Sequence, residues 1–282
     1  MNLSGLIEAL ARQPGEHRRD GAWYARTRDA LRPKIVELFS SPEGIERDFG
    51  PFGRLSLPYT RMGAIDSLDL FGLDELIIFA YYHANRGLYR NALDIGANLG
   101  LHSIVMSRCG FRVKAFEPDA WHYGLLKRNL AANGAAGVEP VEAAVSTRDG
   151  EARFVRVLGN TTGSHLDGSK DSYGDKEYFT VRTVAIQPLL AAADLAKIDA
   201  EGHEKELLLA CTAGQMRTLD IMVEIGNEKN AAAVFAHFQA IGVGMFAQKI
   251  GWERVRRLED VPTSHREGSL FVSARPAMPW PR

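Results

Sequence analysis

The sequence has only two cysteines among its 282 residues, Cys109 and Cys211, and neither belongs to a Cys-x-x-Cys pair. This scarcity excludes a disulfide framework and a cysteine-ligated zinc site. An excess of charge is missing too, because 34 Lys and Arg residues against 35 Asp and Glu residues leave a formal net charge of −1. Proteins that bind nucleic acid usually carry a basic excess that neutralises phosphates, so we expect no nucleic-acid partner.

Long hydrophobic runs and a targeting segment are also missing. The opening MNLSGLIEAL has no basic start and passes directly into the polar ARQPGEHRRD, unlike a secretion signal. The longest apolar run, near LIIFAYY, is too short to cross a bilayer. We therefore predict a cytoplasmic protein without membrane insertion. That apolar run is compatible with a homo-oligomer interface, although packing into the core explains it better.

Strands and helices alternate from Asn91 onward. The strand NALDI is followed by the helix NLGLHSIVMSRCG, the strand RVKAFEP, the helix DAWHYGLLKRNLAANG and the strand VEPVEAAVS. The alternation resumes with DLAKIDA, HEKELLLACTAG, DIMVEI and NEKNAAAVFAHFQAIG, and the chain ends with strand-like GMFAQKI, WERVRRL and SLFVSA. This order predicts an α/β fold with a doubly wound, mostly parallel sheet and antiparallel strands at its end.

The remaining segments differ from this pattern. LSGLIEALAR and TRDALRPKIVELF have the apolar spacing of helices, so we predict an N-terminal helical extension over residues 1–70, with the sheet domain over 71–275. Residues 276–282 are proline-rich and are predicted to form a loose tail. Between the strands EARFVRVL and YFTVRTVAI, the polar stretch 159–177 is predicted to be a mobile loop that serves as a lid or recognises a substrate.

The segment LDIGANLG joins a buried strand to a helix. Gly96 allows a tight turn and Gly100 allows close packing, while the free amides at the helix start can hold a carboxylate or a phosphate. The spacing is GxxxG and not GxGxxG, and Asn98 stands where a dinucleotide pyrophosphate needs a glycine. The methionine part of S-adenosylmethionine needs less room, and Asp94 is placed to bind its amine. The structural alternative is a turn that needs two glycines only for packing.

Acidic residues follow two further strands. Glu117 comes 17 positions after Gly100, where it can accept hydrogen bonds from a ribose diol or interact with the dipole of the next helix. The later block KIDAEGHE holds Asp199, Glu201 and His203 at another strand end. His203 could take a proton from a substrate hydroxyl, and the three side chains together could hold a divalent ion. Alternatively, the acids of this block only stabilise a helix N-terminus.

The segments LDIGANLGLHS, FEP, AAVSTRDGEARF and KIDAEGHEKELL together resemble the signature blocks of FkbM-type methyltransferases. The similarity covers residues 91–224. It implies a Rossmann-like class I methyltransferase sheet with a reversed last strand, and methyl transfer from S-adenosylmethionine to an oxygen of a sugar, glycan or secondary metabolite. The cofactor-binding residues that the resemblance and the motifs indicate are Asp94, Gly96, Asn98, Gly100, Glu117, Ala144, Val145 and Asp199.

Catalytic and substrate-binding roles follow from the same blocks. We predict that His203, Asp199 and Glu201 carry catalysis, and that Asn160 in GNTTGS and Glu224 at the end of DIMVEI contact the acceptor. A divalent metal is compatible with these acids, but nothing in the spacing requires one. The alternatives are a nicotinamide-dependent oxidoreductase, a non-catalytic nucleotide-binding module and a nucleic acid methyltransferase.

Overall fold

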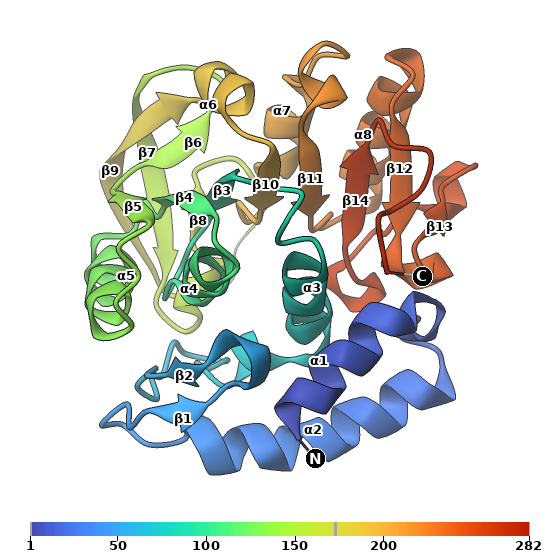
Figure 1. Ribbon diagram of the computed structural model, residues 1–282. Coiled ribbons are helices and arrows are strands. Elements are labelled where there is room, and N and C mark those ends of the chain that lie inside the picture. Colours follow the sequence, from blue (N-terminus) through green and yellow to red (C-terminus); the bar gives the residue numbers. More distant parts are fainter. Residues whose placement is uncertain (1, 172–173, 282) are drawn as a thin grey trace.

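An eight-stranded sheet forms the centre of the computed structural model, which describes residues 2–171 and 174–281 (Figure 1). Its strands are β3 (Asn91–Ile95), β4 (Arg112–Phe116), β5 (Val138–Val141), β10 (Leu195–Ile198), β11 (Asp220–Val223), β12 (Gly244–Ala247), β13 (Glu253–Arg254) and β14 (Leu270–Ser273). They lie in the order β13-β12-β14-β11-β10-β3-β4-β5. The strands from β11 to β5 pair in parallel, whereas β14 is antiparallel to both of its neighbours. The predicted Rossmann-like sheet with a reversed last strand is confirmed.

Helices cover both faces of this sheet (Figure 1). They are α3 (Leu73–Ala84), α4 (Leu101–Arg108), α5 (Ala120–Ala132), α6 (Ile186–Ala192), α7 (Glu204–Leu209) and α8 (Glu228–Ala240). Side chains alternate along β3, so that Ala92 joins the apolar cluster under α3, α4 and α5, while Leu93 and Ile95 join the cluster under α6, α7 and α8. Both faces are buried, which explains the near-continuous apolar runs of the central strands. Within the described residues, no helix has the length and apolar character needed to cross a membrane.

The N-terminal extension comprises two helices and a small antiparallel sheet, namely α1 (Leu3–Arg12), α2 (Ala22–Phe39), β1 (Arg47–Asp48) and β2 (Arg54–Leu55). It lies against α3 (Figure 1). The buried Leu6 and Leu10 of α1 belong to the same apolar cluster as Leu76 of α3. We therefore propose that the extension (1–70) and the sheet domain (71–275) fold around a shared core.

The C-terminal tail packs on this core. Met278 is buried, and the Trp280 ring meets the rings of His17 and Tyr81 edge to face, with both centroid distances at 5.3 Å. The loose tail that the prolines predict for residues 276–282 is therefore wrong at these two positions. Packing of the Trp280 ring on other rings stabilises the segment although it has no regular secondary structure. The last residue, Arg282, lies outside the described residues.

A second, four-stranded sheet stands beside the first one. Its strands are β6 (Ala144–Ser146), β7 (Gly150–Val157), β8 (His165–Leu166) and β9 (Lys176–Ala185), in the order β6-β9-β7-β8. The segment VEPVEAAVS is consequently not one strand, because β5 pairs with β4 in the central sheet while β6 pairs with β9 in the second sheet.

The polar stretch 159–177 also departs from the prediction. It contains a short 3-10 helix (Thr161–Gly163), the strand β8 paired with β7, and the first residues of β9. The stretch is therefore attached to the second sheet at β8 and at the start of β9, and is not irregular throughout. Ser172 and Tyr173, which belong to the same predicted loop, lie outside the described residues.

One buried ion pair connects the two sheets. Asp119 is the N-cap of α5, and its carboxylate accepts hydrogen bonds from Arg156 of β7 at 2.6 and 2.8 Å. Burial acts to raise the pKa of Asp119, but the hydrogen bonds from Arg156 and from the Trp121 amide outweigh burial and lower the pKa below its ordinary value. A carboxyl with a lowered folded pKa contributes stability that is present above its unfolded pKa and is lost as the pH falls through the folded value.

Replacing Arg156 by methionine is expected to lower the free energy of unfolding at pH 7 by about 2 kcal/mol, because the buried Asp119 loses its charged partner. Urea unfolding followed by circular dichroism measures this change, and the variant should also lose less stability than the wild type when the pH falls toward 3. Arg153→Met is the matched control on the same strand, since Arg153 pairs with Asp167 at the surface. Equal losses in the two variants would contradict the prediction.

Candidate functional site

A cavity of about 570 Å³ lies where the carboxyl ends of β3, β4 and β10 face the second sheet. Its size falls within the range of roughly 300–1,000 Å³ that is usual for small-molecule sites. Most of the predicted site residues line it, namely Gly96, Asn98, Glu117, Ala144, Val145, Asn160, Asp199, Glu201, His203 and Glu224. The carboxyl ends of parallel strands meet at one edge of a sheet, which brings together residues that are far apart in the sequence.

Close packing explains why the turn between β3 and α4 has glycine at positions 96 and 100. A Cβ atom on Gly96 would lie 1.8 Å from the carbonyl oxygen of Asp199, and one on Gly100 would lie 2.4 Å from Leu126 Cδ1. Both glycines also have positive φ angles of 80° and 85°. Gly100 does not line the cavity, and its close approach to Leu126 is what the structural alternative expects. Gly96 serves both purposes, since it also lines the cavity.

Asp94 lies beneath the cavity and does not line it. Its side chain is fully buried and accepts a hydrogen bond from Ser103 Oγ at 2.5 Å, and its Oδ1 lies 3.9 Å from Lys197 Nζ. The structure therefore places Asp94 next to Lys197 beneath the cavity, and not on the cavity wall where the predicted contact with a cofactor amine would need it. Lys197 Nζ in turn lies 3.3 Å from Asp199 Oδ2. Burial acts to lower the pKa of Lys197, but Asp199 and Asp94 together raise it, so the lysine stays charged and holds Asp199 in place.

Glu117 closes one end of the cavity. Its carboxylate accepts hydrogen bonds from the backbone amides of Asn98 and Asp119, both at 2.9 Å. Burial raises the pKa of Glu117 to about 8. The apolar side chains of Ala144 and Val145 lie on the wall of the same cavity. This end therefore combines a hydrogen-bond acceptor with an apolar wall, as a nucleoside requires.

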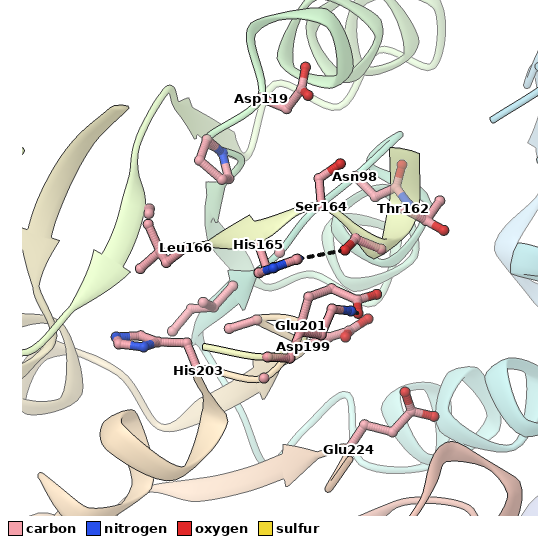
Figure 2. A pocket seen from close by; sticks show the side chains of 18 of the residues that line it. Asn98, Asp119, Thr162, Ser164, His165, Leu166, Asp199, Glu201, His203 and Glu224 are labelled. Carbon is pink, nitrogen blue, oxygen red and sulfur yellow. Dashed lines mark hydrogen bonds and ion pairs between the residues drawn. The ribbon is translucent and has the colours of Figure 1, made fainter. Parts of the chain in front are cut away.

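Three carboxylates line another part of the cavity (Figure 2). Asp199 pairs with Lys197, and Glu201 pairs with Lys170 from the polar stretch. The Glu224 side chain forms no hydrogen bond or ion pair with any residue in the ranges 2–171 and 174–281. Burial raises the pKa of Glu201 and of Glu224, and the nearby charge of Asp199 raises both further. The cavity therefore has an acidic end.

His203 is directed away from these carboxylates (Figure 2). Its Nε2 lies 3.2 Å from Ser146 Oγ and its Nδ1 lies 3.4 Å from Ser169 Oγ. Burial lowers the pKa of His203, so the ring is neutral at pH 7. Asp199, Glu201 and His203 do not converge on one point, and among the described residues no group of three or more His, Cys, Asp or Glu side chains is placed to hold a metal ion. Glu204 accepts hydrogen bonds from the amides of Ala200 and Gly202 and closes the turn.

Several cavity residues come from segments that carry no recognisable motif. Glu75 of α3 lines the cavity and lies 2.7 Å from His102 Nε2. Asn160 forms a β-bridge with Gly63, which brings the segment after residue 60 over the cavity. That segment contributes Ile65, Asp69 and Leu70 to the lining. Local sequence has no signal for these positions, because the contacts join parts of the chain that are far apart.

The sequence of this chain matches one protein family. The family described as Methyltransferase FkbM domain matches residues 94–242. The chain is 28% identical over 138 residues to a protein named hexuronic acid methyltransferase AglP from Haloferax volcanii. The matched part covers 47% of this chain and 54% of that protein, so the chain spans about half the length of the curated relative it matches.

Solved structures with a similar fold include several methyltransferases. The METTL16 MTase domain is 12% identical, with 89% of this chain and 82% of that chain covered and a TM-score of 0.46. An O-methyltransferase from Bacillus cereus, solved in complex with SAH, is 13% identical, with 69% of this chain and 78% of that chain covered and a TM-score of 0.37.

Proposed function

Since this chain belongs to the FkbM methyltransferase family, we propose that it transfers a methyl group from S-adenosylmethionine to a hydroxyl group of a sugar, glycan or secondary metabolite. The observation that carries this proposal is the cavity. One end, at Glu117, has the acceptor and the apolar wall that suit a nucleoside, and the other end, at Asp199, is acidic. The name of the Haloferax volcanii relative supports a sugar-containing acceptor. The acceptor is therefore a small molecule or a glycan.

The residues present fit the cofactor. We assign Glu117 to the ribose hydroxyls, because its two oxygens each hold one backbone amide and retain further lone pairs. Ala144 and Val145 provide an apolar wall for the adenine, and the turn at Gly96 and Asn98 borders the methionine part. When bound, S-adenosylmethionine supplies a methyl group that is already activated on a sulfonium. The protein then has two tasks, which are to align the acceptor and to remove its proton.

We propose that Asp199 is the base that removes the proton from the acceptor hydroxyl. Its side chain is 38% exposed and lines the cavity, and Lys197 fixes its position from below. Glu201 is held by Lys170 and borders the same space. We propose that His203, in contrast, links the turn after β10 to Ser146 of the second sheet and does not act as the base.

Calorimetric titration with S-adenosylmethionine, S-adenosylhomocysteine and NAD tests the cofactor. We expect both adenosyl compounds to bind in the micromolar range, and binding of NAD alone would overturn the proposal. Transfer of a labelled methyl group to a panel of sugars, located on the product by mass spectrometry, then tests the reaction. The same assay with EDTA tests whether the reaction needs a divalent metal. EDTA would remove an ion that polarises the hydroxyl, and activity would then fall.

A further inference from the structure

The acidic end of the cavity has very few cations. Among the described residues that line the cavity, Lys170 is the only lysine and no arginine is present. Lys170 already pairs with Glu201, and Lys197 beneath the cavity pairs with Asp199. Glu75 and Glu224 also line the cavity, and neither faces a lysine or arginine within ion-pair distance in the described part of the chain.

Of these side chains, Glu224 is the one that has neither a hydrogen bond nor an ion pair within the described ranges. Its backbone amide bonds to the carbonyl oxygen of Ile198 at 3.4 Å, which places it at the end of β11 next to the strand that leads into Asp199. The side chain is largely buried, and its remaining exposure is to the cavity. Burial raises the pKa of this carboxyl group, and no described residue supplies a hydrogen bond or a positive charge to it. Its position at the cavity therefore points to a ligand that supplies the missing partner.

Glu75 reaches the same region from α3. Its Oε2 lies 2.7 Å from His102 Nε2, and His102 Nδ1 lies 3.2 Å from the Tyr82 hydroxyl, so the Glu75 carboxylate is held in a fixed position at the cavity. S-adenosylmethionine carries a net charge of +1 and offsets one carboxylate at most. His102 already faces Glu75, so Glu224 is the carboxyl group at this end that has no partner among the described residues.

We infer that the acceptor carries a protonated amino group, as an amino sugar does, and that Glu224 and Glu75 recognise it. This inference rests on the proposed function and names the class of acceptor. An ammonium group matches both carboxylates, whereas the carboxylate of a hexuronic acid would be repelled in a partly buried site. The acceptor preference of this chain therefore differs from the one that the name of its Haloferax volcanii relative states.

Three matched sugars test the inference with the full chain in the presence of S-adenosylhomocysteine. The methyl glycosides of glucosamine, glucose and glucuronic acid differ mainly in charge, and calorimetry gives their dissociation constants. We expect glucosamine to bind more tightly than glucose by about tenfold or more, and glucuronic acid to bind more weakly than glucose. Added salt should reduce this preference.

Glu224→Gln keeps the size of the side chain and removes its charge. The ratio of glucose to glucosamine dissociation constants should fall by about tenfold in this variant. Glu228→Gln is the matched control, because Glu228 is exposed on the first turn of α8 and does not line the cavity. Equal or tighter binding of glucuronic acid, no measurable binding of glucosamine, or an unchanged ratio in Glu224→Gln overturns the inference. Failure of S-adenosylhomocysteine to bind would instead refute the proposed function.

Discussion

Replacing Asp199 by asparagine is expected to lower kcat for methyl transfer by about 100- to 10,000-fold, which is the usual contribution of a positioned general base. Asparagine keeps the shape of the side chain but cannot take up the hydroxyl proton. Lys197 would remain next to it through the carbonyl oxygen of Gly96, which lies 3.3 Å from Lys197 Nζ. Single-turnover transfer of a labelled methyl group measures the chemical step directly.

The effect should be confined to chemistry. We expect the dissociation constant of S-adenosylhomocysteine to change by less than about threefold in Asp199→Asn, because the nucleoside contacts assigned to Glu117 are left intact. His203→Ala serves as the comparison and should lower kcat by less than about tenfold, since its ring contacts Ser146 and Ser169 and is directed away from Asp199. If His203→Ala lost activity and Asp199→Asn kept it, the base would have to be reassigned to the histidine.

Replacing Glu117 by glutamine is expected to weaken S-adenosylmethionine binding by about 30- to 100-fold at pH 8, because the ionised carboxylate that accepts from the ribose hydroxyls in the complex is lost. Glutamine also places an amide NH₂ group against the backbone amides of Asn98 and Asp119, where only acceptors fit. Isothermal titration calorimetry gives the affinity. Glu139→Gln, an exposed glutamate on β5, is the control and should leave the affinity unchanged.

The same residue predicts a pH dependence of cofactor affinity. Burial raises the pKa of Glu117 to about 8, so the carboxyl is mostly protonated at pH 7 in the free protein. Ribose hydroxyls that donate to it favour the ionised form, so the affinity should increase as the pH rises through 8. This increase should be absent in Glu117→Gln. An identical pH profile in the variant would show that Glu117 does not bind the ribose.

Much of the architecture could be predicted from the sequence, for a physical reason. The alternation of apolar strands and helices records which faces are buried, and strands of one parallel sheet end at one edge. Glu117 and Asp199 could therefore be placed beside the same cavity although they are far apart in the chain. The N-cap of α5 is likewise a local feature, since Asp119 is of a residue type that caps helices and stands at the start of the predicted helix DAWHYGLLKRNLAANG.

Only the tertiary structure decided the directions and partners of the side chains. Asp94 and His203 belong to the predicted motifs, yet Asp94 is turned beneath the cavity toward Lys197, and His203 is turned toward the second sheet. Glu75 reaches the cavity from a helix outside the family match, and Trp280 folds back onto His17. Periodicity along the chain reports that a residue is buried, but the atoms it meets come from distant segments. Their identity is therefore determined by how the elements pack, and not by the local sequence.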